Sequence, residues 1–557
     1  MKRWKQIAAL VLALLMLMMT AVGCGEEEET RGFELRAALI NRPVSLDPVY
    51  ATTEEERTIT NHLFENLMKH TAAGLVNGQA AEYTVVTNDD GTETYTFTLR
   101  DDIFWSDGVA VTAEDFVFAW QRLVAPQVAS PHASILEMVA GYEDAIKGDV
   151  DALQVAALDA RTFEVTLREH CPYFLSVICT DTATMPIRVD VVPRWMVDEE
   201  EEADEAAEEE IVVVTPDMQP DWTTKKSTLI ANGAYSVRNY NADHLTLVEK
   251  EGYYDSHRLS VKKLDFFFAQ TIERAMSSYE KGESDFILKC DNVEGSVAVM
   301  QPQVSALAVN QMSSLREEVR QALTLALDRK AIAAAIGTKF VALEGLVPAG
   351  ITTVSGKEFR TVSGVVLPWD EEGVEKNRTQ AQGLLAHLYH LDGNIMNRLG
   401  VISLVYENNF INSRIAQLLK QQWQEVLGIS VTLVSITAEE MDEALGSGAF
   451  TIALMSVSDE TNTVTGYLDH YASGNSENYG QHSSNAYDIL LRAAMASASV
   501  EARDAYLADA ERMLLESGYV IPLCGTAYRY LMREDLTGLL CRDMGVYNFS
   551  FVTEIAA

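Results

Sequence analysis

The stretch WSDG at residues 105–108 is followed, after two residues, by VTAEDF at residues 111–116. Ser, Asp and Gly favour turns, so the first four residues predict a tight turn. Thr112 is a good helix N-cap, and Asp115 stands three residues later, at the spacing of a capping box. Apolar residues then recur at helical spacing, namely Phe116, Ala119, Trp120 and Leu123. The stretch therefore predicts a turn followed by a helix with one buried face.

On both sides of this stretch, apolar periodicity predicts strands and helices in alternation. Before it, residues 33–40 predict a strand, residues 58–69 a helix, and residues 83–86 with 94–100 a hairpin. After it, strands are predicted at residues 162–167, 235–238, 245–250, 263–269, 402–406, 430–434 and 451–455, and helices at residues 271–281, 315–336, 379–389 and 412–427. Such alternation is typical of α/β lobes.

The N-terminus predicts export and lipidation. Basic residues lie at positions 2, 3 and 5, and an apolar run covers residues 7–19. That run is shorter than the roughly 20 residues of a membrane-spanning helix and fits a signal peptide. The next residues, AVGC at 21–24, are similar to a lipobox, in which the cysteine is lipidated and cleavage precedes it. We expect a signal peptide at residues 1–23, a lipid anchor on Cys24 and a tether at residues 24–32. An ordinary signal peptide with a chance cysteine is the alternative.

Composition excludes several classes of partner. The net charge of −39 argues against nucleic-acid binding, because phosphates require a basic surface. Residues 198–210 contain ten acidic residues in thirteen and predict a solvated loop and not a binding site. The five cysteines after Cys24 form an odd set without a Cys-x-x-Cys spacing, which predicts neither a zinc site nor a disulfide scaffold. We expect no metal and no cofactor.

The chain lacks the short motifs that mark common enzyme classes. It contains no Gly-x-Ser-x-Gly, no His-Glu-x-x-His, no phosphate-binding P-loop and no dinucleotide fingerprint. The sequence therefore favours a binding protein over an enzyme, and no catalytic residue is assigned. A secreted hydrolase is the distant alternative.

Several further segments occur in an order that is similar to a known family. They are LDP at 46–48, NHLFENL at 61–67, TFTLR at 96–100, ASPHAS at 129–134, NGAY at 232–235, VRQAL at 319–323 and ALDR at 326–329. With WSDG and VTAEDF, they make the chain resemble the extracellular solute-binding proteins of ABC importers, in the peptide and nickel class. Among these it looks most like the oligopeptide-binding lipoproteins, over roughly residues 33–550.

The resemblance implies a two-lobed α/β fold of the periplasmic-binding-protein type, in the class with an extra inserted domain. The first lobe is expected to comprise residues 33–66, 176–306 and 524–557, with an acidic insertion at 198–210. The inserted small domain is expected at residues 67–175 and the second lobe at residues 307–523. Two crossings of the chain between the lobes form a hinge, and the lobes close around a ligand.

The resemblance also implies a function. The protein is expected to be a monomeric lipoprotein on the extracellular or periplasmic face of the cell membrane. It would capture short peptides in the cleft between the lobes and deliver them to the permease of an ABC transporter. A nickel chelate, a sugar or a signalling peptide is the alternative ligand on the same scaffold.

For the ligand's amino terminus, the resemblance implies an acid in the loop SVSDETN at residues 456–462. A carboxylate suits an ammonium group, because charge-assisted hydrogen bonds are strong. A gapless alignment places the acid at Glu460, and a shift by one residue places it at Asp459, which we favour by residue type. Ser456 and Val457 are expected beside the ligand. The alternative is that both acids are solvated loop residues.

Other ligand contacts implied by the resemblance come from three places. Thr52, Thr53 and Glu54 match a segment that pairs with the ligand backbone as a strand would. His132 occupies a position that is often Tyr and reaches the ligand, and Asn412 matches a position near the ligand's carboxyl end. The chain also departs from the family, because Leu454, Ser456 and Val457 stand where Arg, Gly and Trp are common. A cation and an aromatic wall are thus missing from the second lobe.

Overall fold

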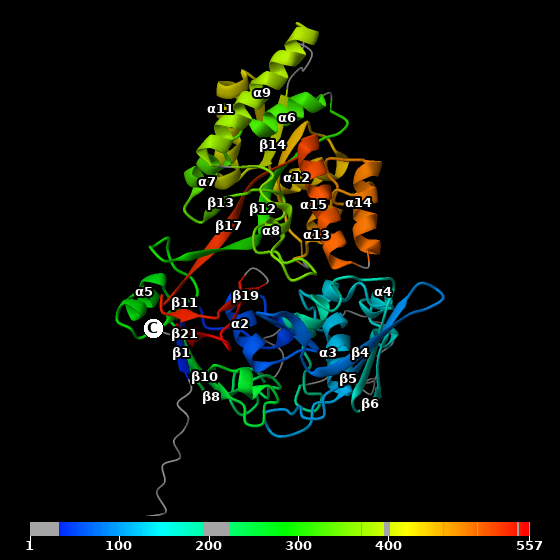
Figure 1. The fold of residues 1–557 in the computed structure, drawn as a ribbon, viewed down its shortest axis with the longest axis vertical. Helices are drawn as coiled ribbons and strands as arrows, with labels where there is room; N and C mark the ends of the chain where they lie inside the picture. Colours follow the sequence, from blue (N-terminus) through cyan, green and yellow to red (C-terminus); the bar gives the residue numbers. More distant parts are fainter. Residues whose placement is uncertain are drawn as a thin grey trace, which may run out of the picture.

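The computed structural model describes residues 33–192, 222–313, 315–368, 370–394, 402–459, 462–497, 499–542 and 545–555. It consists of two α/β lobes stacked along the long axis of the molecule and joined by long strands (Figure 1). The predicted signal peptide, Cys24 and the acidic insertion at 198–210 lie outside the described residues. Within the described ranges, no helix combines the length and the apolar character needed to span a bilayer.

The first lobe is built on a mixed sheet in the order β11-β1-β10-β9-β8. Its strands are β1 (Phe33–Leu39), β8 (Tyr235–Tyr240), β9 (His244–Glu249), β10 (Val261–Phe268) and β11 (Phe286–Ile287). The central strand β1 pairs in parallel with β10 and β11. Leu35, Ala38 and Leu39 are all fully buried, which is typical of a strand covered on both faces. The helices of this lobe are α2 (Glu54–Leu63) and α5 (Ile272–Glu280).

The predicted inserted domain contains a four-stranded antiparallel sheet in the order β4-β5-β7-β6. Its elements are β2 (Met68–Thr71), β3 (Gly74–Asn77), β4 (Ala80–Thr87), β5 (Glu93–Leu99), α3 (Ala113–Val124), α4 (Tyr142–Ala145), β6 (Val155–Asp159) and β7 (Thr162–Leu167). Helix α3 covers one face of the sheet, where the ring centroids of Trp120 and Phe163 lie 5.3 Å apart. The capping box of Thr112 and Asp115 is confirmed.

Three of the motifs that carry the family resemblance meet in the first lobe. The side chain of Asn232 accepts a hydrogen bond from the N–H of Glu65 (3.1 Å) and donates one to the Glu65 carbonyl (2.9 Å). The N–H of Ser106 donates to the Ala231 carbonyl (2.8 Å). Lys250 Nζ donates to the carbonyls of Phe104 and Asn232 (2.5 and 2.6 Å), and burial lowers the pKa of this lysine to about 8. These hydrogen bonds therefore join parts of the lobe that are far apart in the sequence.

The second lobe is a sheet with helices on both faces. Its strands follow the order β15-β14-β16-β12-β17, and β13 also pairs with β17. The elements are β12 (Val297–Val309), α6 (Glu317–Leu325), α7 (Arg329–Ile336), β13 (Phe340–Ala342), α8 (Phe359–Ser363), α9 (Glu371–Leu391), β14 (Ile402–Glu407), α11 (Phe410–Leu427), β15 (Val431–Ile436), α12 (Ala438–Ser447), β16 (Ile452–Val457), α13 (Val464–Asp469), α14 (Asn485–Ala496), α15 (Val500–Ser517) and β17 (Val520–Met532). One buried cluster includes residues of α6, α7, α9 and α11, and another includes residues of α13, α14 and α15.

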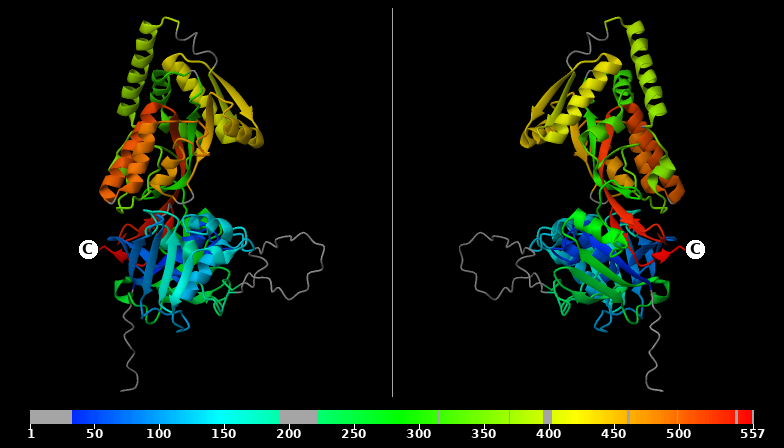
Figure 2. Two further views of the ribbon diagram at one scale, coloured as in Figure 1. Left: turned by 90° about the vertical axis from the view of Figure 1, so that its right-hand side faces the viewer. Right: turned by 90° about the vertical axis from the view of Figure 1, so that its left-hand side faces the viewer.

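The antiparallel pair β12 and β17 carries the described chain from one lobe to the other (Figure 2). Its register is irregular between Met300 and Val304, so the ladder is interrupted there. Val299 packs against the core of the first lobe, whereas Met300 belongs to a core cluster of the second. After β17 the chain ends in the first lobe with β18 (Leu536–Thr537), β19 (Leu540–Arg542), β20 (Val546–Asn548) and β21 (Thr553–Glu554). Strands β12 and β17 therefore connect the lobes by two crossings.

Three predicted helices differ from those observed, and one of them, predicted at 379–389, is the longer α9 at Glu371–Leu391. The helix predicted at 58–69 is α2 at Glu54–Leu63, followed by strand β2. It ends because the backbone N–H and carbonyl of Glu65 both bond the Asn232 side chain. The helix predicted at 315–336 is divided into α6 and α7, because Asp328 caps a new helix by accepting a hydrogen bond from the Ala331 N–H (2.8 Å).

The LDP motif supplies a buried ion pair, which predicts a large effect of mutation on stability. Arg122 donates to both carboxylate oxygens of Asp47 (2.9 and 2.8 Å), and Trp222 Nε1 also donates to Asp47 (2.9 Å). Asp47→Ala would leave the arginine charge buried without its carboxylate. We expect a loss of about 3–5 kcal/mol in the free energy of unfolding, measured with urea. Glu34→Gln, which breaks the exposed pair with Lys263, should cost less than about 1 kcal/mol. Similar losses in both variants would contradict the assignment.

Buried His62 predicts that acid destabilises the fold. Its Nδ1 lies 2.7 Å from the Thr58 carbonyl, its Nε2 accepts the Phe549 N–H (2.9 Å), and burial lowers its pKa from 6.5 to about 4. The unfolded chain binds the proton at higher pH, so this contribution is complete above pH 6.5 and is lost as pH falls through about 4. Between these values we expect His62 to add a slope of about 1.4 kcal/mol per pH unit.

Urea unfolding at a series of pH values checks this slope. His62→Gln should flatten it, and His257→Gln, at an exposed histidine, should not. Parallel curves for the wild type and His62→Gln would show that His62 does not couple folding to pH.

Candidate functional site

A cavity lies between the two lobes. Most of its lining comes from the first lobe, and Asn462, in the loop after β16, comes from the second. The lining residues are Arg57, Pro131, His132, Ser134, Ile135, Asp181 and Asn462. Because both lobes contribute, any change in their separation changes the size of this cavity. It is therefore the candidate site for a ligand held between lobes.

His132, predicted to reach the ligand, lines this cavity. Its Nε2 lies 3.0 Å from the carbonyl of Ala51. Ser130 Oγ, two residues earlier, donates to the carbonyl of Val49 (2.7 Å). The ASPHAS segment thus holds the chain that leads into helix α2. The role of His132 in ligand binding stays a prediction.

The segment predicted to pair with the ligand as a strand is in part the start of a helix. Thr53 has an extended backbone and is the N-cap of α2, whereas Glu54 is the first helical residue. The N–H groups of Thr52 and Thr53 both donate to Glu56 Oε2 (3.1 Å each). These two backbone donors are therefore already occupied by the chain's own carboxylate. The two threonine side chains are exposed.

Glu54 contacts the strand crossing. Its Oε1 accepts a hydrogen bond from Gln301 Nε2 (2.8 Å), and its Oε2 lies 3.2 Å from Lys289 Nζ. Burial raises the pKa of this carboxyl, and Lys289 opposes the shift. Gln301 lies where the register of β12 is irregular, so Glu54 ties the first lobe to the hinge. It is not among the residues that line the cavity.

Asp459 lies in the second lobe, in the loop between β16 and α13. Its Oδ2 accepts hydrogen bonds from the N–H (2.7 Å) and the Oγ1 (3.4 Å) of Thr463. A Cβ atom on Gly466 would lie 2.1 Å from the Asp459 carboxyl carbon, so this glycine leaves the space that the carboxylate occupies. Burial is the main cause of the raised pKa of Tyr173 in the first lobe, and the Asp459 charge adds to it. Asp459 itself is not among the residues that line the interlobe cavity, although Asn462 in the same loop is.

The remaining predicted residues are placed as follows. Glu460 lies outside the described residues. Ser456 is exposed near the end of β16, and Val457 is buried in a core cluster of the second lobe. Asn412 is half-buried in the first turn of α11, where its N–H donates to Asn409 Oδ1 (2.8 Å). Ser456, Val457 and Asn412 are not among the residues that line the interlobe cavity.

An ion pair in the cavity wall was not predicted from the sequence. Arg57 Nη2 lies 3.3 Å from Asp181 Oδ2, and each side chain is 18% exposed. Arg57 stands one residue before the helix predicted at 58–69, and no element was predicted to contain it. A usable signal was present, because Thr53 and Glu56 have the spacing of a capping box that starts a helix before Arg57.

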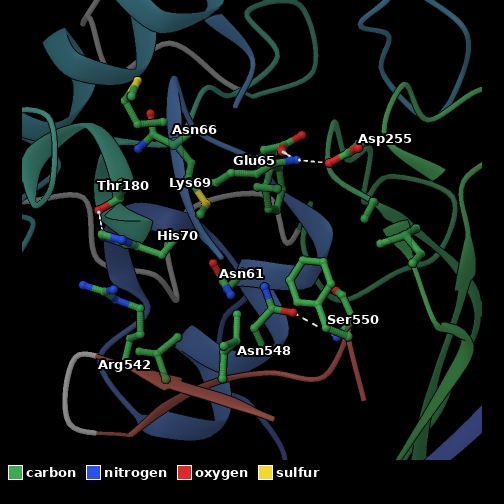
Figure 3. Close-up of a pocket in the computed structure, with 18 of the residues that line it drawn as sticks. Asn61, Glu65, Asn66, Lys69, His70, Thr180, Asp255, Arg542, Asn548 and Ser550 are labelled. Carbon is green, nitrogen blue, oxygen red and sulfur yellow. Dashed lines mark hydrogen bonds and ion pairs between the residues drawn. The ribbon is translucent and has the colours of Figure 1, made fainter. Parts of the chain in front are cut away.

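A second cavity, shown in Figure 3, belongs to the first lobe alone. Lys69 lies between Glu65 (2.8 Å) and Asp255 (3.0 Å), and His70 Nε2 lies 3.4 Å from Thr180 Oγ1. No described residue of the second lobe lines this cavity, so it is a pocket of the first lobe and not a site between the lobes. No group of three or more His, Cys, Asp or Glu in the described part of the chain is arranged to hold a metal ion.

Comparison with known proteins identifies the family. Residues 75–479 match the profile of the bacterial extracellular solute-binding proteins, family 5 Middle. The chain belongs to this family. It is a solute-binding protein of the ABC-importer type and not an enzyme. The predicted two-lobed α/β fold is confirmed.

Individual relatives are similar over nearly their whole length. The dipeptide-binding protein DppE of Bacillus subtilis is 25% identical, with 91% of this chain and 89% of the relative covered. The periplasmic oligopeptide-binding protein OppA of Salmonella typhimurium is 27% identical, with 90% and 88% covered. The unliganded open form of the periplasmic murein tripeptide-binding protein MppA superposes with a TM-score of 0.73 at 25% identity, covering 91% of this chain and 94% of that one.

Proposed function

We propose that this solute-binding protein captures short peptides between its lobes and delivers them to the permease of an ABC importer. The observation that carries the proposal is the cavity lined by both lobes. Relatives that cover about nine-tenths of the chain are named for binding dipeptides and oligopeptides. The chain is proposed to act as a monomer, anchored through lipid on Cys24 to the outer face of the membrane.

Capture follows from closure of the lobes. The similarity to an unliganded open form supports an open state for the present structure. A ligand that touches both walls gains its full set of contacts only in the closed state, so binding shifts the population toward closure. The irregular ladder between Met300 and Val304 is the proposed bending point.

The amino terminus of the peptide is proposed to bind the acidic loop before α13. Asp459 is the favoured anchor, with Glu460 kept beside it. A carboxylate held by the backbone N–H of Thr463 is fixed before ligand arrives, which reduces the entropy lost on binding. The bound ammonium would gain charge-assisted hydrogen bonds.

Substitution of the acids tests both the function and the anchor. Asp459→Asn should weaken peptide binding about 10- to 100-fold, because a hydrogen bond to a charged group contributes about 1.5–3 kcal/mol. Native mass spectrometry of the purified protein identifies any retained ligand, and titration calorimetry with a peptide library measures affinity. Glu460→Gln is the partner variant. A retained ligand that is not a peptide, or unchanged affinity in both variants, would reject the assignment.

Gly466 offers a test of Asp459 that leaves the acid in place. Gly466→Ala puts a methyl group where the Asp459 carboxylate lies, so the carboxylate must move. Alanine is the better helix former, so the fold should be retained. We expect peptide affinity to fall by about tenfold, and the thermal midpoint without ligand to change little. Gly383→Ala in α9, where nothing lies within 4 Å of the new Cβ, is the matched control. Equal affinity in the two variants would show that the position of Asp459 is irrelevant to binding.

A further inference from the structure

The interlobe cavity contains one pair of opposite charges. Arg57 and Asp181 are the only Lys, Arg, Asp or Glu residues among its described lining. They lie 124 residues apart in the sequence and meet at 3.3 Å. Their side chains are each 18% exposed, so the pair is mostly shielded but still reaches the cavity. The hydrogen-bond donors and acceptors of this pair that the protein does not use determine which ligand group the pair can bind.

Asp181 is occupied by the protein itself. Its Oδ1 accepts the N–H of Ala183 (2.7 Å), which caps the turn that follows, and its Oδ2 accepts Arg57. Its backbone carbonyl accepts Asn66 Nδ2 (2.9 Å). The carboxylate is thus fixed in position by the fold. It acts as a support for Arg57.

Arg57 has unused donors. A guanidinium carries five N–H donors, and in the described part of the chain that of Arg57 makes one hydrogen bond, to Asp181. None of its other nitrogens is among the buried atoms that lack a partner, so they face the cavity or solvent. At 3.3 Å, the bond to Asp181 is longer than the roughly 2.7–2.9 Å of a strong charge-assisted bond. The guanidinium can therefore be shared with a second anion.

We propose that Arg57 binds a carboxylate of the peptide and that Asp181 is its positioning residue. This inference rests on the proposed function and adds a preference for peptides with a carboxylate at this point. The guanidinium fork matches a carboxylate in two parallel hydrogen bonds, and shielding from water strengthens the interaction. The cation that the second lobe lacks at Leu454 is then supplied by the first lobe.

The opposite wall completes the arrangement. Asn462 lines the same cavity from the second lobe, and its N–H donates to the carbonyl of Asp459 (3.2 Å). Its side-chain Oδ1 is buried and has no partner in the part of the chain that the structure describes. This oxygen is placed to accept an N–H of the ligand. A zwitterionic peptide would therefore bridge the lobes, with its ammonium on the Asp459 side and its carboxylate on Arg57.

Calorimetric titration with matched peptides tests the inference. The first pair is an alanine peptide with a free C-terminal carboxylate and the same peptide as its C-terminal amide. The second pair places Glu or Gln within an amidated alanine peptide, and lengths from about two to six residues are used. The wild type should prefer the carboxylate member of one pair by about 10- to 100-fold. The first pair reports a terminal carboxylate and the second an acidic side chain.

Four variants make the result specific to Arg57. Arg57→Gln should abolish the preference, and Arg57→Lys should restore part of it, because lysine keeps the charge and loses the fork. Asp181→Asn retains an oxygen for the Ala183 cap but not a second one for Arg57, so it should reduce the preference, as expected of a positioning residue. Arg274→Gln, at an exposed arginine of α5, is the matched control and should behave as the wild type.

The outcomes separate this inference from the proposed function. If the wild type binds peptides without preference in either pair, or if Arg57→Gln keeps the wild-type preference, Arg57 is not a carboxylate subsite. If Asp181→Asn keeps the full wild-type preference, Asp181 does not position Arg57 and that part of the inference is overturned. Absence of binding to every peptide by the wild type would remove the proposed function together with the inference.

Discussion

The relation between the two lobes depends on a single antiparallel pair, β12 with β17. Strand β17 pairs with β12 along both lobes and then with β11 of the first-lobe sheet, so one hydrogen-bonded sheet continues from one lobe into the other. A continuous ladder resists bending. In this ladder the register shifts between Ser305 and Ala306, and the pairing is interrupted between Met300 and Val304. Pro302 stands in this interval and has no N–H to donate, and Gly525 faces Val304 with no side chain. The lobes therefore cannot separate, and the motion left to them is rotation about this short interval.

Because the lobes rotate about this interval, the cavity between them has one wall from each lobe, and the two walls are built differently. The first lobe presents a fixed wall in which Glu56 holds the start of α2, Asp181 holds Arg57, and His132 contacts Ala51. The second lobe presents a loop that precedes α13, with Asp459 held by Thr463. Neither wall surrounds a ligand alone. In the proposed function, the free energy that drives closure is the difference between the ligand's contacts with both walls and its contacts with one wall. A ligand that bridges the walls therefore stabilises the closed state.

The fold could be predicted from sequence to a large extent, and the site only in part. WSDG, NHLFENL and NGAY are recognisable because Asn232, Lys250 and the Glu65 backbone need specific partners whatever the ligand. The start of α2 was placed four residues late because apolar periodicity begins at Ile59, although the capping box at Thr53 and Glu56 was readable. The Arg57–Asp181 pair could not be predicted, because local patterns do not report which side chains meet across 124 residues. Val457 was expected beside the ligand by alignment, whereas alternation along β16 turns it into the core.

The overall charge bears on how a zwitterionic peptide would enter the cavity. With a net charge of −39, the protein repels carboxylates and attracts ammonium groups at long range. Salt screens this field within about 8–10 Å, so it orients an approaching peptide but does not hold it. The ammonium end is then favoured to approach first, while Arg57 acts on the carboxylate only at contact distance. In the proposed site, discrimination between peptides therefore arises late in binding, when closure brings the carboxylate against Arg57, and it would be expressed in the dissociation rate more than in the association rate.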